Sequence, residues 1–188
     1  MKHDRVFLSI IIGLALLGSA HAQFAFSPLV ADLEPQSGKN SEVFQVVNQG
    51  SETIAIRFSV STRQQARDGS DVLGSAQDLA SIFPRQAVLK PGEQRQVRFS
   101  WTGPKEIGQE QAFRVIAEQV PVQVPGESRT GSGLGIQFRF MASVYVAPRL
   151  AKAAIEARPS PDGKGVLLSN TGSRHILLKK ISLDCLDE

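Results

Sequence analysis

The chain of 188 residues contains a single cysteine, Cys185, so no disulfide can form within it. Tryptophan and tyrosine occur once each. Lysine and arginine never form a run of more than two, and the formal net charge at pH 7 is only +3. This charge pattern gives no electrostatic case for binding nucleic acid. The fold must therefore rest on a buried apolar core, for which the chain is long enough.

Histidine is also scarce, and after residue 22 only His175 remains. A Ser-His-Asp arrangement needs a histidine held by a carboxylate within reach of a serine. A structural zinc site typically takes four cysteine or histidine ligands. His175 follows Arg174 in a strand-like run, and we interpret it as an ordinary surface residue. We therefore expect no enzyme, no metal site and no cofactor.

The N-terminus has the pattern of a secretory signal peptide. Lys2 and Arg5 precede an apolar stretch over residues 6–18, and Ala20-His21-Ala22 matches a cleavage site. The apolar stretch is too short for a stable membrane span. We predict that residues 1–22 are a signal peptide, that the chain is exported, and that the mature protein does not insert into a membrane.

The rest of the sequence has the period of β-strands, because apolar residues alternate with polar or small ones. Turn signals such as Asn48-Gln49-Gly50 and Pro91-Gly92 separate the runs, and residues 68–81 are predicted to be a loop. No window after residue 22 has a convincing helical period. The sequence predicts an all-β sandwich with strands over residues 43–47, 53–60, 94–101 and 113–120.

One further strand is predicted over residues 134–141, after a run rich in glycine and serine and before Ala147-Pro148. Every second residue of this strand is apolar, which gives it one hydrophobic face. That face either completes the core of its own sandwich or is offered to another protein. Its apolar residues are Leu134, Ile136, Phe138 and Phe140, and two later residues, Val144 and Val146, are assigned to the core.

A short internal similarity suggests two related β-domains joined near Pro148. Asn48-x-Gly50 and Asn170-x-Gly172 are each followed by alternating apolar residues. Only 40 residues follow Pro148, whereas an immunoglobulin-like domain needs about 100. We expect an immunoglobulin-like β-sandwich over residues 23–147. Residues 148–188 are expected to form a hinge and the truncated start of a second such domain.

Four segments in the same order resemble the periplasmic chaperones of the chaperone–usher pathway of pilus assembly. Residues 88–98 resemble the family pattern L-x-P-G-x-x-Q-x-V-R, and residues 110–121 resemble the strand E-x-x-F-R-V that follows it. Asn48-x-Gly50 and the ending Val-Tyr-Val-Ala-Pro at residues 144–148 complete the order. The resemblance extends over residues 24–170 and is strongest to the archaic, spore-coat-like branch.

The resemblance implies a function. Such chaperones have two immunoglobulin-like domains and insert their seventh strand into the groove of a pilus subunit that lacks its own last strand. This strand addition is established for the family. The subunit then passes to an outer-membrane usher, without ATP or a cofactor. The implied donor side chains are Leu134, Ile136 and Phe138, with Phe140 as a fourth.

The resemblance also implies an anchor for the carboxylate at the subunit's C-terminus. Classical members use an arginine and a lysine, which correspond to positions near Val30 and at Ser143 here, and neither position is basic. Arg139 and Arg114 are the alternative candidates, since a guanidinium binds a carboxylate in a fork. Both are equally compatible with ordinary solvated strand residues.

The same resemblance places an interdomain hinge at Pro148 and Arg149, with Glu110 near the cleft as a candidate partner of Arg149. Two other function classes stay open. A structural pilus subunit or adhesin needs a donor extension, yet the first predicted strand begins near Phe24. A carbohydrate-binding immunoglobulin-like module would need an aromatic platform, for which only Trp101 and Tyr145 are present besides the phenylalanines.

Overall fold

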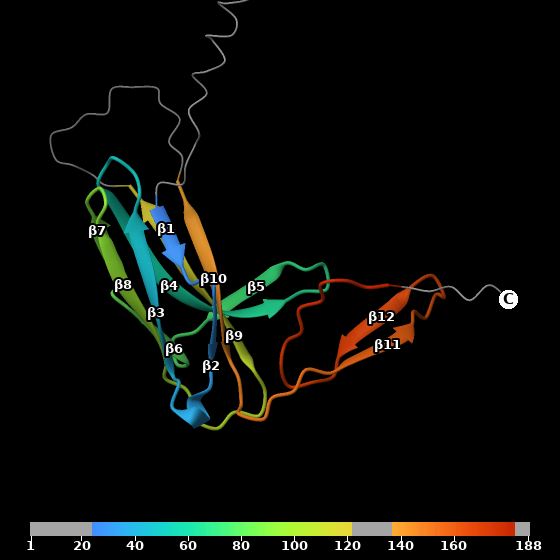
Figure 1. Cartoon of the computed structure of the whole chain (residues 1–188). Coiled ribbons are helices and arrows are strands. Elements are labelled where there is room, and N and C mark those ends of the chain that lie inside the picture. The colour runs from blue at the N-terminus through green and yellow to red at the C-terminus, as the bar shows by residue number, and fades with distance from the viewer. Residues whose placement is uncertain (1–23, 122–136, 183–188) are drawn as a thin grey trace, which may run out of the picture.

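The computed structural model describes residues 24–121 and 137–182, and this part of the chain consists of strands and one three-residue 3-10 helix, η1 (Figure 1). The all-β prediction is confirmed. The elements are β1 Phe24–Ser27, β2 Val30–Leu33, η1 Pro35–Ser37, β3 Ser41–Asn48, β4 Ile54–Gln65, β5 Asp71–Ser75, β6 Ala80–Phe83, β7 Gln86–Leu89, β8 Gln94–Trp101, β9 Gln111–Val120, β10 Arg139–Val146, β11 Ile155–Pro159 and β12 Val166–Asn170.

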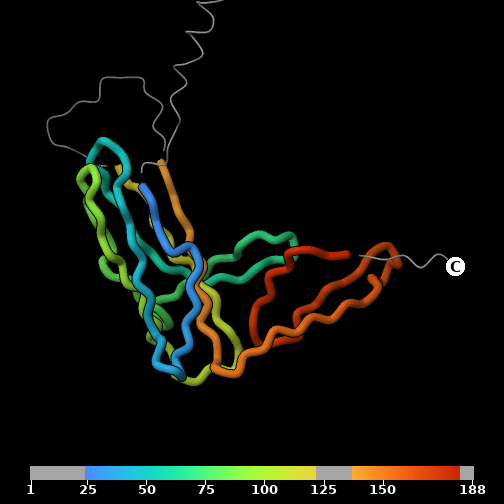
Figure 2. The backbone as a smooth tube through the Cα atoms, viewed as in Figure 1, coloured from blue at the N-terminus to red at the C-terminus, as the bar shows by residue number. Residues whose placement is uncertain are grey.

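Two sheets pack face to face as a sandwich (Figures 1 and 2). One has the strand order β1-β3-β8-β6, and the other has the order β2-β10-β9-β4-β5, with β7 also paired to β4. The chain changes sheets between β1 and β2, so that β1 lies beside β3 while β2 lies beside β10. The β4–β5 hairpin projects from the sandwich (Figure 1).

Apolar side chains on the inner faces of both sheets form the core, as the alternation predicts. Four phenylalanines are fully buried, and Val144 and Val146 of β10 are fully buried as well, which confirms their assignment to the core. Aromatic rings join the sheets, since Phe99 of β8 and Phe113 of β9 lie 5.7 Å apart between ring centroids. The four phenylalanines are Phe24, Phe44, Phe99 and Phe113.

The prediction of a loop over residues 68–81 is wrong, because this stretch contains β5 and the start of β6. All but the first residue of β5 are exposed, so the strand has no buried face that would leave an alternating pattern. Its conformation is instead maintained by backbone pairing with β4, from Ser61 opposite Ser75 to Gln65 opposite Asp71. Backbone pairing of this kind leaves no signal in composition or period.

The strand predicted over residues 134–141 overlaps β10 at residues 139–141. Strand β10 begins at Arg139 and continues to Val146, and residues 134–136 lie outside the described residues. The predicted signal peptide at residues 1–22 also lies outside them. In the described part of the chain there is no helix with the length and apolarity that a membrane span requires.

The two Asn-x-Gly turns that suggested an internal repeat have the same hydrogen bonds. The Asn48 carboxamide oxygen accepts from the Gly50 backbone N–H at 2.9 Å, and its NH₂ group donates to the Glu52 carbonyl at 2.7 Å. Asn170 repeats this pattern with Gly172 at 3.0 Å and the Arg174 carbonyl at 2.7 Å. Asn48 is fully buried and also donates to the Leu89 carbonyl at 3.0 Å, whereas Asn170 is exposed.

This difference in burial leads to a matched prediction. Replacing Asn48 by alanine leaves buried backbone groups without partners, at a cost of about 1–3 kcal/mol for each. Asn170→Ala removes the same bonds at an exposed site, where water replaces them, and should cost about 0.5 kcal/mol or less. Urea denaturation of both variants measures the two costs. Equal losses of stability would contradict the role assigned to burial.

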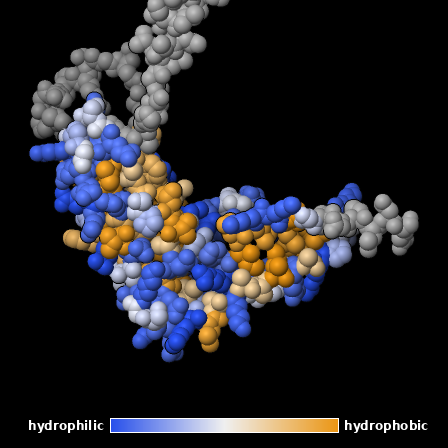
Figure 3. Space-filling view, in the orientation of Figure 1, coloured by the Kyte–Doolittle hydropathy of each residue, from blue (hydrophilic) through white to orange (hydrophobic). Residues whose placement is uncertain are grey.

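The residues after Pro148 form a separate two-stranded sheet of β11 and β12, set off from the sandwich (Figure 1). A hydrophobic patch covers this part of the surface in Figure 3, and it includes the exposed residues Ile155, Val166 and Leu167. The segment after β12 returns to the sandwich, where the Glu110 N–H donates to the Ser173 carbonyl at 3.1 Å.

Candidate functional site

The outer edge of β10 is covered along only half of its length. On one side β9 pairs with all of β10, from Arg139 opposite Glu118 to Val146 opposite Gln111. On the other side β2 pairs only with residues 143–146. Among the described residues no strand pairs with residues 139–142 on that side, so the first half of β10 is an open sheet edge.

Backbone hydrogen bonds show which groups face this open edge. The Phe138 carbonyl accepts from the Gln119 N–H at 3.0 Å, towards β9, whereas the Ser143 N–H donates to the Leu29 carbonyl at 2.8 Å, on the opposite side. Successive residues of an antiparallel strand direct their N–H and C=O groups to alternate sides. Arg139 and Met141 therefore present their backbone groups to the open edge.

Two of the four predicted donor side chains, Phe138 and Phe140, lie at this end of the sandwich. Phe138 and Phe140 are half-buried and pack against the core, and the Phe140 ring meets that of Phe24 edge to face at 4.8 Å. Leu134 and Ile136 lie outside the described residues. Phe138 and Phe140 therefore face the chain's own core, at the end of β10 whose edge is open.

The outer face of the sheet brings Val30, Ser143 and Arg114 into one row. Ser143 pairs with Val30 of β2 on one side and with Arg114 of β9 on the other. The Arg114 guanidinium donates to the Ser143 hydroxyl at 2.5 Å. Arg114 of β9 therefore places a basic group beside Val30 and Ser143, the two positions of the classical anchor, neither of which is basic here.

Arg139, the other candidate anchor, lies two rows away on the same face. It is exposed and stands opposite Glu118 in the register between β10 and β9. A neighbouring carboxylate reduces the positive potential that Arg139 can offer to an anion. The structure does not bring Arg139 and Arg114 together as one site.

Arg114 instead shares a carboxylate with a second arginine. Asp71 of β5 accepts from Arg63 Nε at 2.7 Å and from Arg114 Nε at 2.7 Å, through different oxygens. Arg63 Nη1 also donates to the Tyr145 hydroxyl at 3.0 Å. The hydrogen bonds from Arg114 and Arg63 lower the pKa of Asp71 below its usual range, which keeps this carboxylate ionised.

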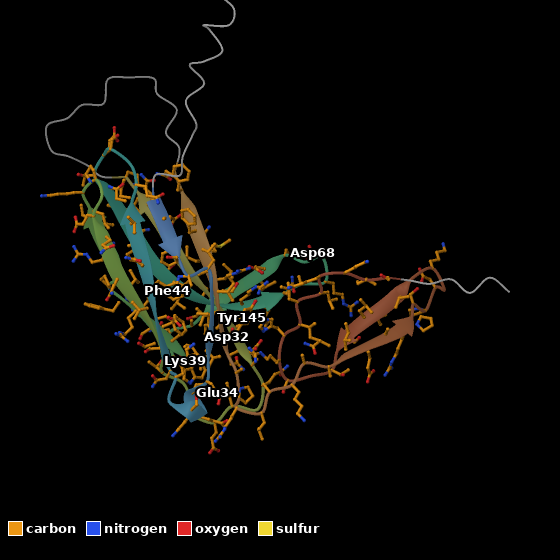
Figure 4. The ribbon with its side chains drawn as sticks, in the orientation of Figure 1. Asp32, Glu34, Lys39, Phe44, Asp68 and Tyr145 are labelled. Carbon is orange, nitrogen blue, oxygen red and sulfur yellow. The ribbon has the colours of Figure 1, made fainter. Side chains whose placement is uncertain are left out.

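A cleft of about 380 Å³ opens beside this cluster, between the sandwich and the segment after β12. Its lining combines polar groups with apolar side chains. Tyr145, labelled in Figure 4, lies on the sheet face here, and its ring stacks on that of His175 with 3.7 Å between centroids. The lining includes Val30, Arg63, Glu110, Tyr145, His175 and Ile176.

Glu110 connects the sandwich to the C-terminal segment. Its side chain is 6% exposed, and Oε1 accepts from the His175 backbone N–H at 3.1 Å and lies 2.8 Å from Nδ1 of the same histidine. Oε2 has no hydrogen-bond partner but lies 3.7 Å from Nε of Arg174. Glu110 and Arg174 therefore form an ion pair without a hydrogen bond, because 3.7 Å exceeds hydrogen-bond distance.

Two expectations about this region need correction. His175 is not an ordinary surface residue, since it is stacked, hydrogen-bonded and only partly exposed. Glu110 does not pair with Arg149 in the described structure, where its ion pairs are with Arg174 and His175. Arg149 is exposed, and its backbone N–H donates to the Gln36 side chain at 2.9 Å, beside the end of β10.

Comparison with known families gives a match from β2 to β10. The family model for pili and flagellar-assembly chaperones, PapD N-terminal domain, matches residues 30–152. The chain belongs to this family. The PapD N-terminal family consists of chaperones and is not a class of enzymes. None of the curated proteins compared with the chain matches it.

Solved structures show that the fold is the PapD-like, immunoglobulin-like β-fold. A chaperone–tip adhesin complex of CFA/I fimbriae biogenesis is 19% identical, with a TM-score of 0.61 over 81% of this chain and 70% of that one. The class 5 fimbriae chaperone CfaA is 19% identical, with a TM-score of 0.61 and coverages of 80% and 67%. A CsuC–CsuE complex from the archaic Csu pili of Acinetobacter baumannii is 17% identical, with a TM-score of 0.62 and coverages of 81% and 79%.

Sequence reasoning missed two residues of this PapD-like domain, Arg63 and Asp71. Arg63 lay beyond the predicted end of its strand, and Asp71 lay in the predicted loop. The sequence offered only an indirect signal for this cluster, namely charged residues without an assigned role. They are Arg63, Asp71 and Arg114. Their proximity depends on the pairing of β4 with both β5 and β9, which local patterns do not reveal.

Proposed function

We propose that this chain is a periplasmic chaperone that holds pilus subunits by adding its own β10 region to them as a strand and then delivers them to an outer-membrane usher. A signal peptide at residues 1–22 would direct it there. The observation that carries the proposal is the open edge at residues 139–142, which is continuous with an apolar face. Strand addition needs both features, a row of free backbone groups and alternating side chains for pockets.

The subunit's missing strand defines what fills the groove. Leu134, Ile136 and Phe138 are proposed as the donated side chains, and Phe140 as a fourth that remains partly engaged with Phe24 of the sandwich. Each apolar side chain moved from water into a groove contributes about 1.5–3 kcal/mol. The summed free energy of several such side chains offsets part of the entropy that the two proteins lose when they associate.

For the subunit's C-terminal carboxylate we propose Arg114 rather than Arg139. Arg114 lies in the row of Val30 and Ser143 and next to a cleft, and it is only 17% exposed on its side chain. Low exposure strengthens a charge-assisted bond relative to one in open solvent. Arg139 is exposed and faces Glu118 across the ladder.

The chaperone–subunit complexes among the similar structures support pilus subunits as the partner class. The matched complexes join a chaperone to a tip adhesin in CFA/I fimbriae and in Csu pili. An enzyme, or a pilus subunit in its own right, is not favoured by any observation on the described residues. The alternative of a carbohydrate-binding module gains nothing either, because Trp101 is buried in the core.

The test is capture of a co-expressed pilus subunit by the full chain carrying Ile136→Asp or Phe138→Asp. A buried charge in the subunit's groove is strongly unfavourable, so we expect capture to fall to background. Gln137→Asp is the matched control, because Gln137 is exposed and the alternation of the sequence assigns it to the face opposite Ile136 and Phe138. It should capture normally.

Folding of each variant is checked by circular dichroism and thermal unfolding, since Phe138 also touches the core. Loss of capture by Ile136→Asp as well would show that the effect of Phe138→Asp is not caused by damage to the core. Normal capture by both donor variants would refute strand donation. Loss of capture by Gln137→Asp to the same extent would refute the assignment of the donating face.

A further inference from the structure

Three charged side chains from three different strands meet on the outer face of the sheet. Asp71 of β5 receives Arg63 of β4 through Oδ1 and Arg114 of β9 through Oδ2, and Arg114 Nη2 also lies 2.7 Å from Oδ2. The three side chains are 16–19% exposed. The cluster is thus largely shielded from solvent and is bonded at short distances.

The cluster has more charge and more donors than its own acceptors use. Two guanidiniums face one carboxylate, which leaves one net positive charge. Each guanidinium has five N–H donors in a planar fork. Among the described residues, the acceptors that they reach besides Asp71 are the Ser143 and Tyr145 hydroxyls. A partly buried cationic pair with donors to spare favours a second anion.

The cleft beside the cluster indicates where that anion would enter. Arg63 and Tyr145 belong both to the cluster and to the cleft lining. Val30 and Ile176 supply apolar surface in the same lining. A peptide with an apolar last residue could therefore bind with its C-terminal carboxylate at Arg63 and its last side chain against Val30 and Ile176.

We infer that Asp71 is a positioning residue, which fixes Arg63 and Arg114 as a pair of guanidiniums that receives a carboxylate at the mouth of the cleft. The inference rests on the proposed function, in which that carboxylate is the C-terminus of a pilus subunit. It adds Arg63 as a second binding group and Asp71 as the residue that orients both.

The physical reason for an orienting residue is the flexibility and mutual repulsion of two arginines. A free arginine loses up to about 2 kcal/mol of rotamer entropy when it is fixed. Asp71 fixes both side chains in the unliganded protein and offsets the repulsion between them. Because the pKa of Asp71 is lowered by the two arginines, it keeps this role as the pH falls towards the usual range of a carboxyl group.

The opposite role for Asp71 is also chemically coherent, and the two differ in their consequences. If Asp71 merely occupied the arginines as a competing carboxylate, its removal would free them and strengthen binding. If Asp71 positions them, its removal weakens binding, because each arginine must then be ordered by the ligand alone. The sign of the change in affinity therefore decides between the two roles.

The experiment uses the full chain and two small probes, N-acetyl-leucyl-leucine with a free carboxylate and the same dipeptide as its C-terminal amide. NMR follows the Nε–Hε signals of Arg63 and Arg114 during titration. We expect the acid to shift both signals and the amide to shift neither. In Asp71→Asn we expect the affinity for the acid to fall about tenfold, which corresponds to about 1.4 kcal/mol.

Two further variants separate positioning from general damage. Asp71→Glu keeps the charge and should restore part of the affinity. Asp68→Asn is the matched control, because Asp68 lies at the tip of the same hairpin (Figure 4) and bonds only within its turn, to Ser70. It should bind like the wild type, and thermal unfolding confirms that each variant is folded.

Several results would overturn the inference. Tighter binding of the acid by Asp71→Asn would make Asp71 a competitor, and unchanged binding would leave it without a role. Equal binding of acid and amide, or no binding of the acid by the wild type, would remove the carboxylate site. Strand donation is tested separately, because Ile136→Asp should lose subunit capture and still bind the acid probe.

Discussion

Replacing Met141 by proline is expected to abolish subunit capture while the sandwich stays folded, and the same substitution one residue later should destabilise the sandwich. Met141 directs its N–H to the open edge of β10 and is 44% exposed. Proline lacks the N–H and is tolerated in strands where that group faces away from the ladder. A partner strand that pairs there loses a main-chain hydrogen bond and meets the proline ring.

Ala142 provides the matched contrast. It is fully buried and lies opposite Val115 of β9. Like Phe138, which accepts from the Gln119 N–H, Ala142 directs its backbone groups towards β9. Ala142→Pro would leave the Val115 carbonyl without its donor, at a cost of about 1–3 kcal/mol. The ring would add a steric clash with the neighbouring strand.

Urea denaturation and co-purification with a pilus subunit together test this pair of substitutions. Met141→Pro should unfold near the wild-type midpoint but retain no subunit, and Ala142→Pro should unfold at a clearly lower urea concentration. A Met141→Pro variant that retains the subunit normally would show that pairing does not occur on this edge. Destabilisation of both variants to the same degree would contradict the assignment of backbone directions.

Most of the sandwich could be predicted because its strands have one buried and one exposed face. Strands β3, β4 and β8 bury alternate residues, and this alternation is what the sequence shows. Strand β5 was missed because its exposed side chains leave no such record. The burial of a strand, and not its hydrogen bonding, is what makes it visible in a sequence.

The same difference separates the parts of the candidate site that the sequence predicted from those that it did not. The apolar alternation at Phe138 and Phe140 could be read directly, and the structure places both at the end of the core next to the open edge. The bridge from Asp71 to Arg114 joins residues 43 positions apart through three neighbouring strands. Such a contact depends on the register of the whole sheet, which a local pattern does not specify.

His175 shows the same limit from another direction. Its neighbours in the chain give it the pattern of a surface residue, yet its imidazole lies against Tyr145 and Glu110. Tyr145 lies near the end of β10, and Glu110 lies just before the start of β9. The contact arises because the segment after β12 returns to the sheet, and no local sequence signal marks that return.

Glu110→Ala should loosen the attachment of this segment, which is the second large effect that we expect. The substitution removes the acceptor of the His175 backbone N–H and the carboxylate that faces Arg174. Hydrogen bonds to charged groups contribute about 1.5–3 kcal/mol each. We therefore expect hydrogen exchange at the His175 amide to accelerate by roughly one to two orders of magnitude, since 1.4 kcal/mol corresponds to a factor of ten.

Exchange in the core strands should stay unchanged, because Glu110 itself lies just before β9 and outside the core cluster. The radius of gyration from small-angle X-ray scattering should rise as β11 and β12 gain freedom relative to the sandwich. The Glu110 N–H would still donate to the Ser173 carbonyl, so the attachment is weakened rather than removed.

Arg149→Ala is the informative control, since the sequence alone favoured Arg149 as the partner of Glu110. The structure gives Glu110 two other partners, so the side chain of Arg149 should not affect exchange at His175. Faster exchange in Arg149→Ala, with no change in Glu110→Ala, would reverse the assignment. The expected result instead makes Glu110 a residue that holds the C-terminal segment through His175 and Arg174, beside Asp32, which accepts from Arg174 at 3.0 Å. This segment forms one side of the cleft that Arg63 and Tyr145 line.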